Sequence, residues 1–210
     1  LDLRPKFTLV DVTKNIQRLD TRFLEDSLAR HSSGVAVLAH PEDVMDTQAI
    51  KPEQIRRVLR LLRSMFDFVI IDTCNTFDES TIEAFESSDL IVLVSTVDLP
   101  AIRNARRCLN MFRRFGYGND KVKLVFNREA KSNEITLKQA EKVLNYPIFW
   151  KLPNDYPTTI ASVNEGELIN KVAPRSDLHR SMLGLTAELT GLDVARKAPR
   201  GVFGKLLGRG

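Results

Sequence analysis

Short apolar runs alternate along the chain with longer segments in which apolar residues recur every three or four positions. The runs are rich in β-branched residues and do not alternate strictly with polar residues, which is typical of strands covered on both faces of a sheet. On this pattern we expect five strands, at residues 34–39, 68–72, 90–95, 122–127 and 147–152.

The segments between these runs have the spacing of amphipathic helices. Residues 51–65 place their apolar side chains on one helical face, and Pro52 suits the first turn. Residues 99–116 repeat the pattern and end at Gly116, a residue that commonly terminates a helix. Two more helices are expected, within residues 136–145 and 177–189. Strands that alternate with helices form right-handed βαβ units, so the sequence predicts an α/β fold with a doubly wound, mostly parallel sheet and helices on both faces.

The composition is that of a globular domain, with 43% apolar and 28% charged residues in 210. The sequence has no apolar run of about 18 residues and no charged-then-apolar leader, so we expect neither a membrane span nor export. The two cysteines lack CxxC spacing, which argues against a disulfide framework and a zinc site. The predicted location is the cytoplasm.

A carboxylate, Asp72, directly follows the apolar run that begins at Phe68. Ligands of an open parallel sheet bind beyond the carboxyl ends of its strands. A carboxylate held there is suited to ordering the waters of a Mg²⁺ ion, and an apolar run that ends in Asp is the Walker B pattern. Asp also caps turns after buried strands, so the pattern alone leaves both interpretations open.

Two further segments place polar residues at the ends of predicted strands. Asn127 and Arg128 end one run, and the Asn amide offers a donor and an acceptor that match an edge of adenine. Pro153, Asn154 and Asp155 form a predicted turn after the last run, and a helix is expected to follow it. If the sheet is parallel, both segments lie at the same edge as the carboxylate that ends the earlier run.

The order of four segments resembles the MinD/ParA group of deviant-Walker P-loop ATPases. The segments are DFVIIDT (67–73), DLIVLVSTVDL (89–99), VKLVFNRE (122–129) and LPNDYPTTIASVNEGELINKVAPRSDLHRSM (152–182). LDLRPKFTLVDV followed by SGVAVLAHPED is most similar to the CpaE/TadZ-type subgroup of pilus-assembly localisation proteins. The resemblance covers nearly all of residues 1–193, and its fourth segment is the most specific part.

The resemblance implies ATP and Mg²⁺ as cofactors and assigns roles to the polar residues above. Asp72 would position a magnesium-bound water, and Thr73 would lie in the switch that follows it. Asn127 and Arg128 would face adenine, and the turn 153–155 would frame the base from the other side.

A phosphate-binding loop of the family's type, K-G-G-x-G-K-[ST], is not found in the sequence. The nearest mimic, Gly204-Lys205, is not followed by Ser or Thr, and Cys74 stands where the family usually has Pro or a small residue. In the family the loop, the first strand and a strand with a catalytic acid precede the position of Leu1. We therefore expect residues 1–193 to be the C-terminal two-thirds of an ATPase domain with its N-terminal strands missing. Such a segment by itself would contain no catalytic residue and bind ATP poorly or not at all.

The resemblance implies a nucleotide-switched positioning protein. Two copies would close as a homodimer around two ATP molecules, and hydrolysis would open the dimer. The output would be recruitment of Flp or type IV pilus secretion machinery to the inner membrane or cell pole. Two alternatives stay open: a nucleotide-independent scaffold of the same fold, and a ParA-like DNA-partitioning ATPase.

Residues 194–210 form a basic tail that is separate in composition from the rest of the chain. Phe203, Leu206 and Leu207 fall on one face of a short helical pattern, with Lys205 beside them. Basic amphipathic segments of this kind lie on anionic membrane surfaces. The glycines of the tail disfavour a helix, so a solubilising, unstructured tail is the competing interpretation.

A second basic cluster lies in the helix predicted at residues 99–116, with Arg103, Arg107 and Arg114 on one face. These arginines would suit nonspecific contacts with DNA phosphates. The competing interpretation is a solvated helix face, which the absence of interleaved aromatic residues favours.

Overall fold

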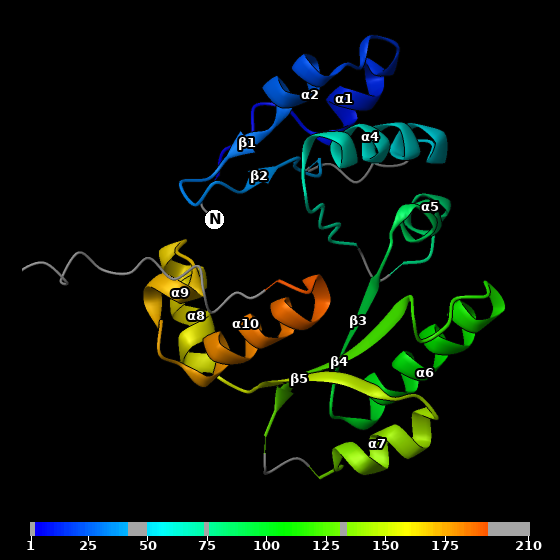
Figure 1. The fold of residues 1–210 in the computed structure, drawn as a ribbon, viewed down its shortest axis with the longest axis vertical. Helices are drawn as coiled ribbons and strands as arrows, with labels where there is room; N and C mark the ends of the chain where they lie inside the picture. Colours follow the sequence, from blue (N-terminus) through cyan, green and yellow to red (C-terminus); the bar gives the residue numbers. More distant parts are fainter. Residues whose placement is uncertain (1–2, 42–49, 74–75, 131–133, 193–210) are drawn as a thin grey trace, which may run out of the picture. The chain divides into compact units, whose positions relative to one another are not determined.

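The computed structural model describes residues 3–41, 50–73, 76–130 and 134–192. The chain divides into two compact units, Leu1–Ile91 and Val92–Gly210. Figure 1 labels the helices and strands of both units.

The first unit is mainly helical. Its elements are α1 (Leu9–Lys14), η1 (Ile16–Arg18), α2 (Thr21–Ser27), β1 (Ala29–Arg30), β2 (Ala36–Val37), α4 (Pro52–Met65) and α5 (Glu79–Ser87). Val12 of α1, Leu24 of α2 and Val58 of α4 are buried together and form its core. The helix predicted at residues 51–65 is thus confirmed, with its apolar face turned to this core.

Carboxylates start two of these helices. The side chain of Asp20 accepts a hydrogen bond from the Phe23 N–H at 2.8 Å, and that of Asp78 accepts one from the Thr81 N–H at 2.7 Å. Each bond satisfies a backbone donor that the first turn of a helix leaves without a partner. Helices α2 and α5 therefore each begin directly after an Asp.

A buried carboxylate joins α5 to α4. The Glu83 side chain is 6% exposed and accepts two hydrogen bonds from Arg56, from Nε at 2.8 Å and from Nη2 at 2.5 Å. The Ser87 hydroxyl donates a third, at 2.8 Å. The guanidinium and the hydroxyl together hold the pKa of the Glu83 carboxyl below its usual value, against the opposing effect of burial.

The second unit contains a three-stranded sheet in the order β3-β4-β5, in which β4 and β5 are parallel. Its elements are β3 (Ile91–Thr96), α6 (Leu99–Arg114), β4 (Val122–Glu129), α7 (Leu137–Leu144), β5 (Ile148–Pro153), α8 (Tyr156–Glu165), α9 (Ile169–Val172) and α10 (Asp177–Thr190). Figure 1 shows α6 and α7 on one side of the strands and α8, α9 and α10 on the other. The predicted α/β fold, with parallel strands and helices on both faces, is confirmed.

Strand β4 shows why a continuous apolar run predicts a central strand. Val122, Leu124, Val125 and Phe126 are all buried, so side chains pointing to both faces of the sheet are covered by helices. Val125 packs with Leu152 of β5 and Leu178 of α10. These contacts fix the ends of β4 and β5 that carry the candidate site.

The side chain of Trp150 locks α10 against β5. Its Nε1–H donates to the Ser181 hydroxyl at 3.0 Å, and this hydroxyl donates to the Lys151 carbonyl at 3.0 Å. A Cβ atom at Gly184 would lie 2.8 Å from the Trp150 ring, closer than carbon atoms approach without displacement. Glycine at this position therefore permits the close approach of helix and indole.

Two of the five predicted strands need correction. Residues 68–72 form no strand, and Phe68 and Ile70 are 57% and 92% exposed. Of residues 34–39 only Ala36–Val37 are a strand, and they pair antiparallel with β1 instead of joining a parallel sheet. An apolar run predicts burial but not a partner, and among the described residues no strand hydrogen-bonds to residues 68–72.

None of the helices in the described parts of the chain is long and apolar enough to cross a bilayer.

Candidate functional site

Strand β4 carries one extra residue at its carboxyl end. Between the paired positions Phe126 and Glu129 it has two residues, Asn127 and Arg128, where β5 has one. An extra residue of this kind is a β-bulge, which bends the strand and redirects its side chains. Bulges are over-represented next to binding sites, so Asn127 and Arg128 are candidate binding residues.

The bulge holds Arg128 in a left-handed backbone conformation, with φ of 55°. A side chain with a Cβ atom is strained there by on the order of 1 kcal/mol, and glycine is the residue that avoids this cost. The Asn127 side chain supports the conformation, because its Oδ1 accepts a hydrogen bond from the Arg128 N–H at 2.9 Å. The local fold thus tolerates a strained backbone at Arg128, which lies at this edge of the sheet.

The predicted turn after β5 lies beside this bulge. Pro153 is the last residue of β5 and pairs with Glu129. The Asn154 N–H donates to the Glu129 carbonyl at 2.9 Å. Asp155 is the N-cap of α8, and its carboxylate accepts a hydrogen bond from the Thr158 N–H at 3.2 Å. The structure therefore brings the predicted residues of both strand ends together at one edge.

Asp72 and Thr73 belong to the first unit, where both are exposed and lie outside any helix or strand. The described residues contain no group of three or more His, Cys, Asp or Glu that could hold a metal ion. A lone carboxylate such as Asp72 suits Mg²⁺, which is commonly held by one or two carboxylates together with waters and phosphates. Cys74 and the tail residues lie outside the described residues: Phe203, Lys205, Leu206 and Leu207.

The end of β3 carries a polar pair that the sequence pattern did not predict. The Thr96 hydroxyl donates to Asp98 at 2.5 Å, and Asp98 accepts a second hydrogen bond from the Ala101 N–H at 2.9 Å. These donors hold the pKa of the Asp98 carboxyl below its usual value. An Asp two residues before Pro100, which lies in the first turn of a predicted helix, is the signal that could have revealed this N-cap.

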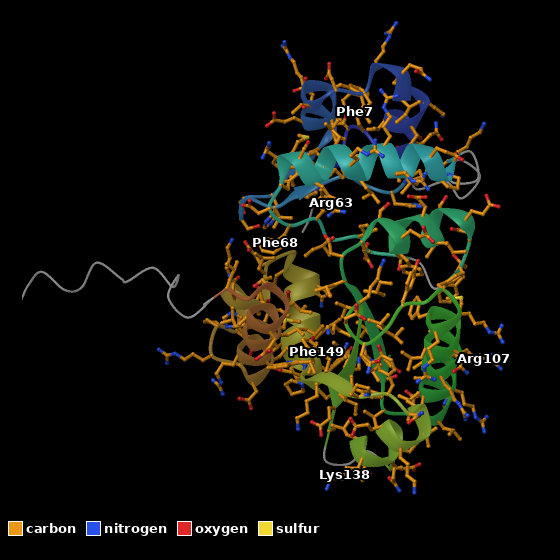
Figure 2. All side chains as sticks on the ribbon, turned by 45° about the vertical axis from the view of Figure 1, so that its right-hand side comes forward. Phe7, Arg63, Phe68, Arg107, Lys138 and Phe149 are labelled. Carbon is orange, nitrogen blue, oxygen red and sulfur yellow. The ribbon has the colours of Figure 1, made fainter. Side chains whose placement is uncertain are left out.

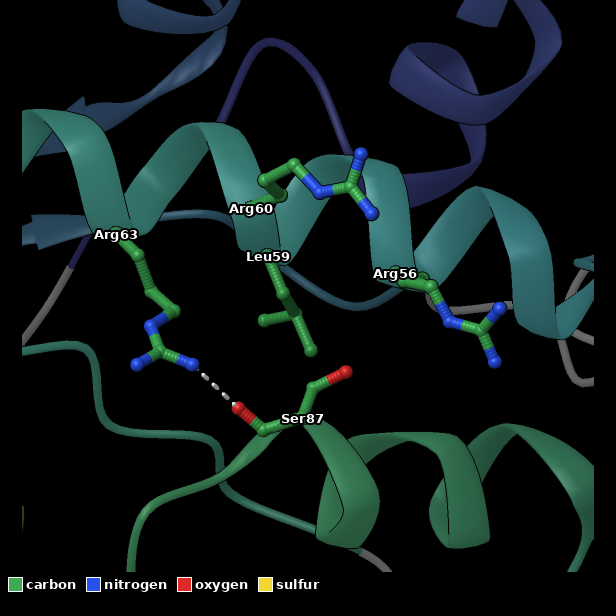
Figure 3. A pocket seen from close by; sticks show the side chains of 5 residues that line it. All are labelled: Arg56, Leu59, Arg60, Arg63 and Ser87. Carbon is green, nitrogen blue, oxygen red and sulfur yellow. Dashed lines mark hydrogen bonds between the residues drawn. The ribbon is translucent and has the colours of Figure 1, made fainter.

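A pocket of about 270 Å³ lies between α4 and α5, and neither Asp72 nor Thr73 lines it (Figure 3). Its walls are Arg56, Leu59, Arg60, Arg63 and Ser87. Arg63 donates to the Ser87 carbonyl at 3.0 Å and to the Asp89 carboxylate at 3.0 Å. Two of the three arginines, Arg56 and Arg63, hydrogen-bond to α5 or to the loop that follows it. The main role of these side chains is therefore to hold α4 against α5.

The basic face of α6 is exposed and its apolar face is buried. Ile102, Ala105, Leu109 and Phe112 are covered, as the predicted amphipathic helix requires. Figure 2 shows Arg107 pointing away from the strands. The exposed arginines of this helix are Arg103, Arg106, Arg107, Arg113 and Arg114.

One of these arginines already has a structural task. Arg113 donates to the Asn145 carbonyl at 2.8 Å, and its guanidinium lies 5.8 Å from the centre of the Tyr146 ring. It therefore ties α6 to the end of α7. The geometry agrees with a solvated face, and DNA binding by α6 stays a prediction.

No known family model matches the chain. Sequence relatives are more informative. The septum site-determining protein MinD of Thermotoga maritima is 23% identical over 168 residues, 77% of this chain and 60% of that protein. A putative MinD of Chlorella vulgaris is 28% identical over 178 residues, 81% of this chain and 61% of that protein. An uncharacterized ATP-binding protein of Methanocaldococcus jannaschii is 23% identical over 169 residues, 80% of this chain and 63% of that protein. The chain thus spans about three-fifths of the length of these relatives.

Solved structures have the same fold. A ParA family ATPase from Chlorobium tepidum superposes with a TM-score of 0.82 at 25% identity, over 89% of this chain and 76% of that one. MinD from Pyrococcus horikoshii in complex with Mg-ADP has a TM-score of 0.71 at 20% identity, over 91% of this chain and 75% of that one. A MinC:MinD complex from Aquifex aeolicus has a TM-score of 0.73 at 16% identity, over 91% of this chain and 76% of the matched one.

The chain has the α/β fold of the P-loop NTPase class, with parallel strands between two layers of helices. The bulge and the turn at the carboxyl ends of β4 and β5 lie where open sheets of this class bind ligands. Within the class, the chain is similar in sequence to MinD proteins and an ATP-binding protein, and in structure to a ParA family ATPase and to MinD.

Proposed function

We propose that the chain forms the base-binding part of a nucleotide-switched ATPase of the MinD/ParA type. The observation that carries this proposal is the bulge at Asn127 and Arg128, which sets two polar side chains beside the turn at Asn154. Strain at a non-glycine residue is retained where the side chain is needed, and bulges of this type accompany binding sites.

The Asn127 amide is suited to adenine. Its Oδ1 is occupied by the Arg128 N–H, so its Nδ2 is the group that remains to donate to a ligand. Adenine presents ring nitrogens that accept hydrogen bonds, and the planar guanidinium of Arg128 can stack on a base face. The segment 153–155 is expected to frame the base on its other side.

Asp72 is the proposed magnesium residue, through a bound water, and Thr73 the proposed switch residue. When bound, Mg²⁺ neutralises the negative charge of the phosphates. The exposed carboxylate at Asp72 accepts hydrogen bonds from the waters of such an ion without having to displace them. In the native protein the phosphate-binding loop is expected to come from outside residues 1–210.

For the cellular role we propose localisation of pilus secretion machinery, in the manner of the CpaE/TadZ-type subgroup. The support is the resemblance of the segments at residues 1–12 and 33–43 to that subgroup. A homodimer, a cytoplasmic location and a peripheral contact of the tail with the inner membrane or cell pole complete the proposal. One structural neighbour is a complex of MinD with the protein MinC, which supports a role in recruiting partners.

The deciding experiment is nucleotide titration by calorimetry with the full-length protein. Asn127→Ala is expected to weaken ATP binding about tenfold, the worth of one hydrogen bond to a ligand. Asn104→Ala makes the same chemical change on the exposed face of α6 and should leave binding unchanged. Equal affinities for both variants would refute the adenine assignment. If the unmodified full-length protein does not bind ATP, the alternative of a nucleotide-independent scaffold is favoured.

Asp72→Ala tests the other half of the site. The variant is expected to lose the magnesium dependence of ATP binding, whereas Asp67→Ala, on the same segment, should keep it. For the cellular role, microscopy of the tagged protein and a count of surface pili would be compared between the two variants. Normal pili and normal positioning in the Asp72→Ala strain would contradict the switch.

A further inference from the structure

Helix α8 exposes a stripe of apolar side chains. Tyr156, Ile160 and Val163 are 62%, 37% and 69% exposed, and their spacing of four and three residues puts them on one face. None of the residues of α8 is buried. The second unit therefore contains a helix whose apolar face has no cover among the residues that the structure describes.

The ends of α8 are fixed although its face is bare. The Asp155 carboxylate caps the start, and Gly166 ends the helix in a left-handed conformation with φ of 65°. A helix of ten residues is marginal in water without packing of an apolar face. Caps set where this helix begins and ends, but they do not replace that packing.

The chain itself supplies a segment that fits. Helix α10, which packs on β5, ends at Thr190, and Gly191 turns the backbone there with φ of 67°. Residues 193–210 follow and lie outside the described residues. At about 3.3 Å per residue, residues 203–207 can lie up to about 36–50 Å from Leu192, while α8 is about 15 Å long. Reach does not limit a contact between the tail and α8.

The chemistry of the two partners is complementary. Phe203, Leu206 and Leu207 are apolar, and no acidic residue follows Asp193 in the tail. The stripe on α8 is apolar as well, so contact between the two would remove apolar side chains of both from water. The exposed carboxylate Glu165 lies on the opposite face of the helix and takes no part in this contact.

We propose that the C-terminal segment 203–207 docks within its own chain on the stripe formed by Tyr156, Ile160 and Val163. The contact covers α8 and withholds the apolar residues of the tail from other surfaces. If the tail also binds membranes, which rests on the proposed function, docking and lipid binding exclude one another, because both use the same side chains. The tail is then released only when a competing surface is present.

The test is hydrogen exchange of the α8 backbone amides in the full-length protein. Deletion from residue 193 onward is expected to speed exchange in residues 158–164 at least tenfold. The double variant Phe203→Ser, Leu207→Ser should do the same, and Val194→Ser, in the same tail, should not. Unchanged exchange after the deletion would overturn the proposal, because α8 is then covered by another part of the chain or not at all.

A second test introduces two cysteines, Val163→Cys and Phe203→Cys, in a background with Cys74→Ser and Cys108→Ser. The disulfide that forms shows whether the tail docks within its own chain or on a second copy. The proposal predicts a cross-linked monomer whose yield does not change on dilution. A cross-linked dimer that disappears on dilution would overturn docking within one chain. Neither readout requires nucleotide, so failure of the ATPase assignment and failure of this proposal are separable.

The competing surface is tested with vesicles of anionic phospholipid. Val163→Asp breaks the stripe without touching the tail, and it should increase the bound fraction several-fold over the unmodified protein. Val143→Asp changes an exposed valine of α7 and serves as the matched control. Equal vesicle binding by Val163→Asp and Val143→Asp would contradict the proposed competition.

Discussion

The Oδ1 atom of Asn127 accepts a hydrogen bond from the backbone N–H of Arg128 at 2.9 Å, and Arg128 is held left-handed with φ of 55°. The first residue thus supports the strained backbone of the second. Glycine would fit that backbone better, yet the chain has the largest cationic side chain there. The proposed contact of the guanidinium with a nucleotide would account for a non-glycine residue at this position.

Arg128→Gly is expected to stabilise the fold and weaken the site. Release of about 1 kcal/mol of strain, partly offset by the entropy of an unfolded glycine, should raise the free energy of unfolding by about 0.5 kcal/mol. Nucleotide affinity of the full-length protein should fall about tenfold with the loss of the guanidinium. Urea unfolding and calorimetry measure the two effects.

Asn145→Gly is the control for this experiment, because Asn145 is the other described non-glycine residue with a positive φ, at 45°. It ends α7 and belongs to no proposed site, so stability should rise while affinity stays unchanged. If Arg128→Gly likewise leaves affinity unchanged, the strain at Arg128 is not retained for nucleotide binding.

Glu83 predicts how stability depends on pH. Its pKa is lowered in the folded protein, so the stabilisation is fully present above the unfolded value of about 4.3 and is lost as the pH falls through the lower, folded value. Glu83→Gln should lower the free energy of unfolding by about 2 kcal/mol at neutral pH and flatten the decline in stability that the unmodified protein shows as the pH falls below the unfolded value. Urea titrations at several pH values measure both.

The matched control is Glu25→Gln. Glu25 also pairs with an arginine, Arg30, but both side chains are 54% exposed. An exposed pair contributes little, so this variant should be within about 0.5 kcal/mol of the unmodified protein at every pH. A similar cost for the two variants would show that burial of Glu83 is not what makes its ion pair matter.

Gly184→Ala tests the approach of α10 to the indole. In an open helix this substitution stabilises by about 1 kcal/mol, but here the new Cβ would meet the Trp150 ring at 2.8 Å. We expect a net loss of about 1–3 kcal/mol, measured by urea unfolding. Helix propensity alone would raise the free energy of unfolding, and a clash with Trp150 would lower it. A stabilised variant would therefore rule out the close contact.

Asp155 separates a structural cap from a charged binding group. Asp155→Ala should cost about 1 kcal/mol and speed amide exchange at the start of α8, whereas Asp155→Asn keeps a capping oxygen and should cost little. Asp98→Ala removes a cap of the same type from α6 and should leave α8 unaffected. If Asp155→Asn lowers nucleotide affinity without a loss of stability, the negative charge itself contacts the ligand.

The parts of the fold that sequence predicted are those specified by local pattern. Helices α4 and α6 have apolar residues on one face, and β4 has a continuous buried run. Residues 68–72 have an equally apolar run and yet form no strand. A strand depends on hydrogen bonds to a neighbour that lies far away in the sequence, so residue types within the run cannot specify it.

The candidate site divides in the same way. Sequence placed Asn127 and Arg128 at the end of a strand, because polar residues that follow a buried run must emerge at the edge of the sheet. It did not reveal the bulge or the left-handed Arg128, because both depend on the register between β4 and β5. The stripe on α8 was hidden for a similar reason: its residues are apolar at helical spacing, and only the packing shows that they are left uncovered.

The packing of Trp150 has a practical consequence, because the chain contains one tryptophan only. Trp150 pairs with Val125 in the register of β4 and β5. It lies three residues before Pro153, in the strand whose end carries the candidate site. The tryptophan fluorescence of residues 1–210 therefore originates at a single known place, between the sheet and α10. A ligand that shifts the end of β5, or a variant that loosens α10, should change the wavelength of emission without any attached label. Trp150 is thus an intrinsic optical probe in the strand whose end carries the candidate site.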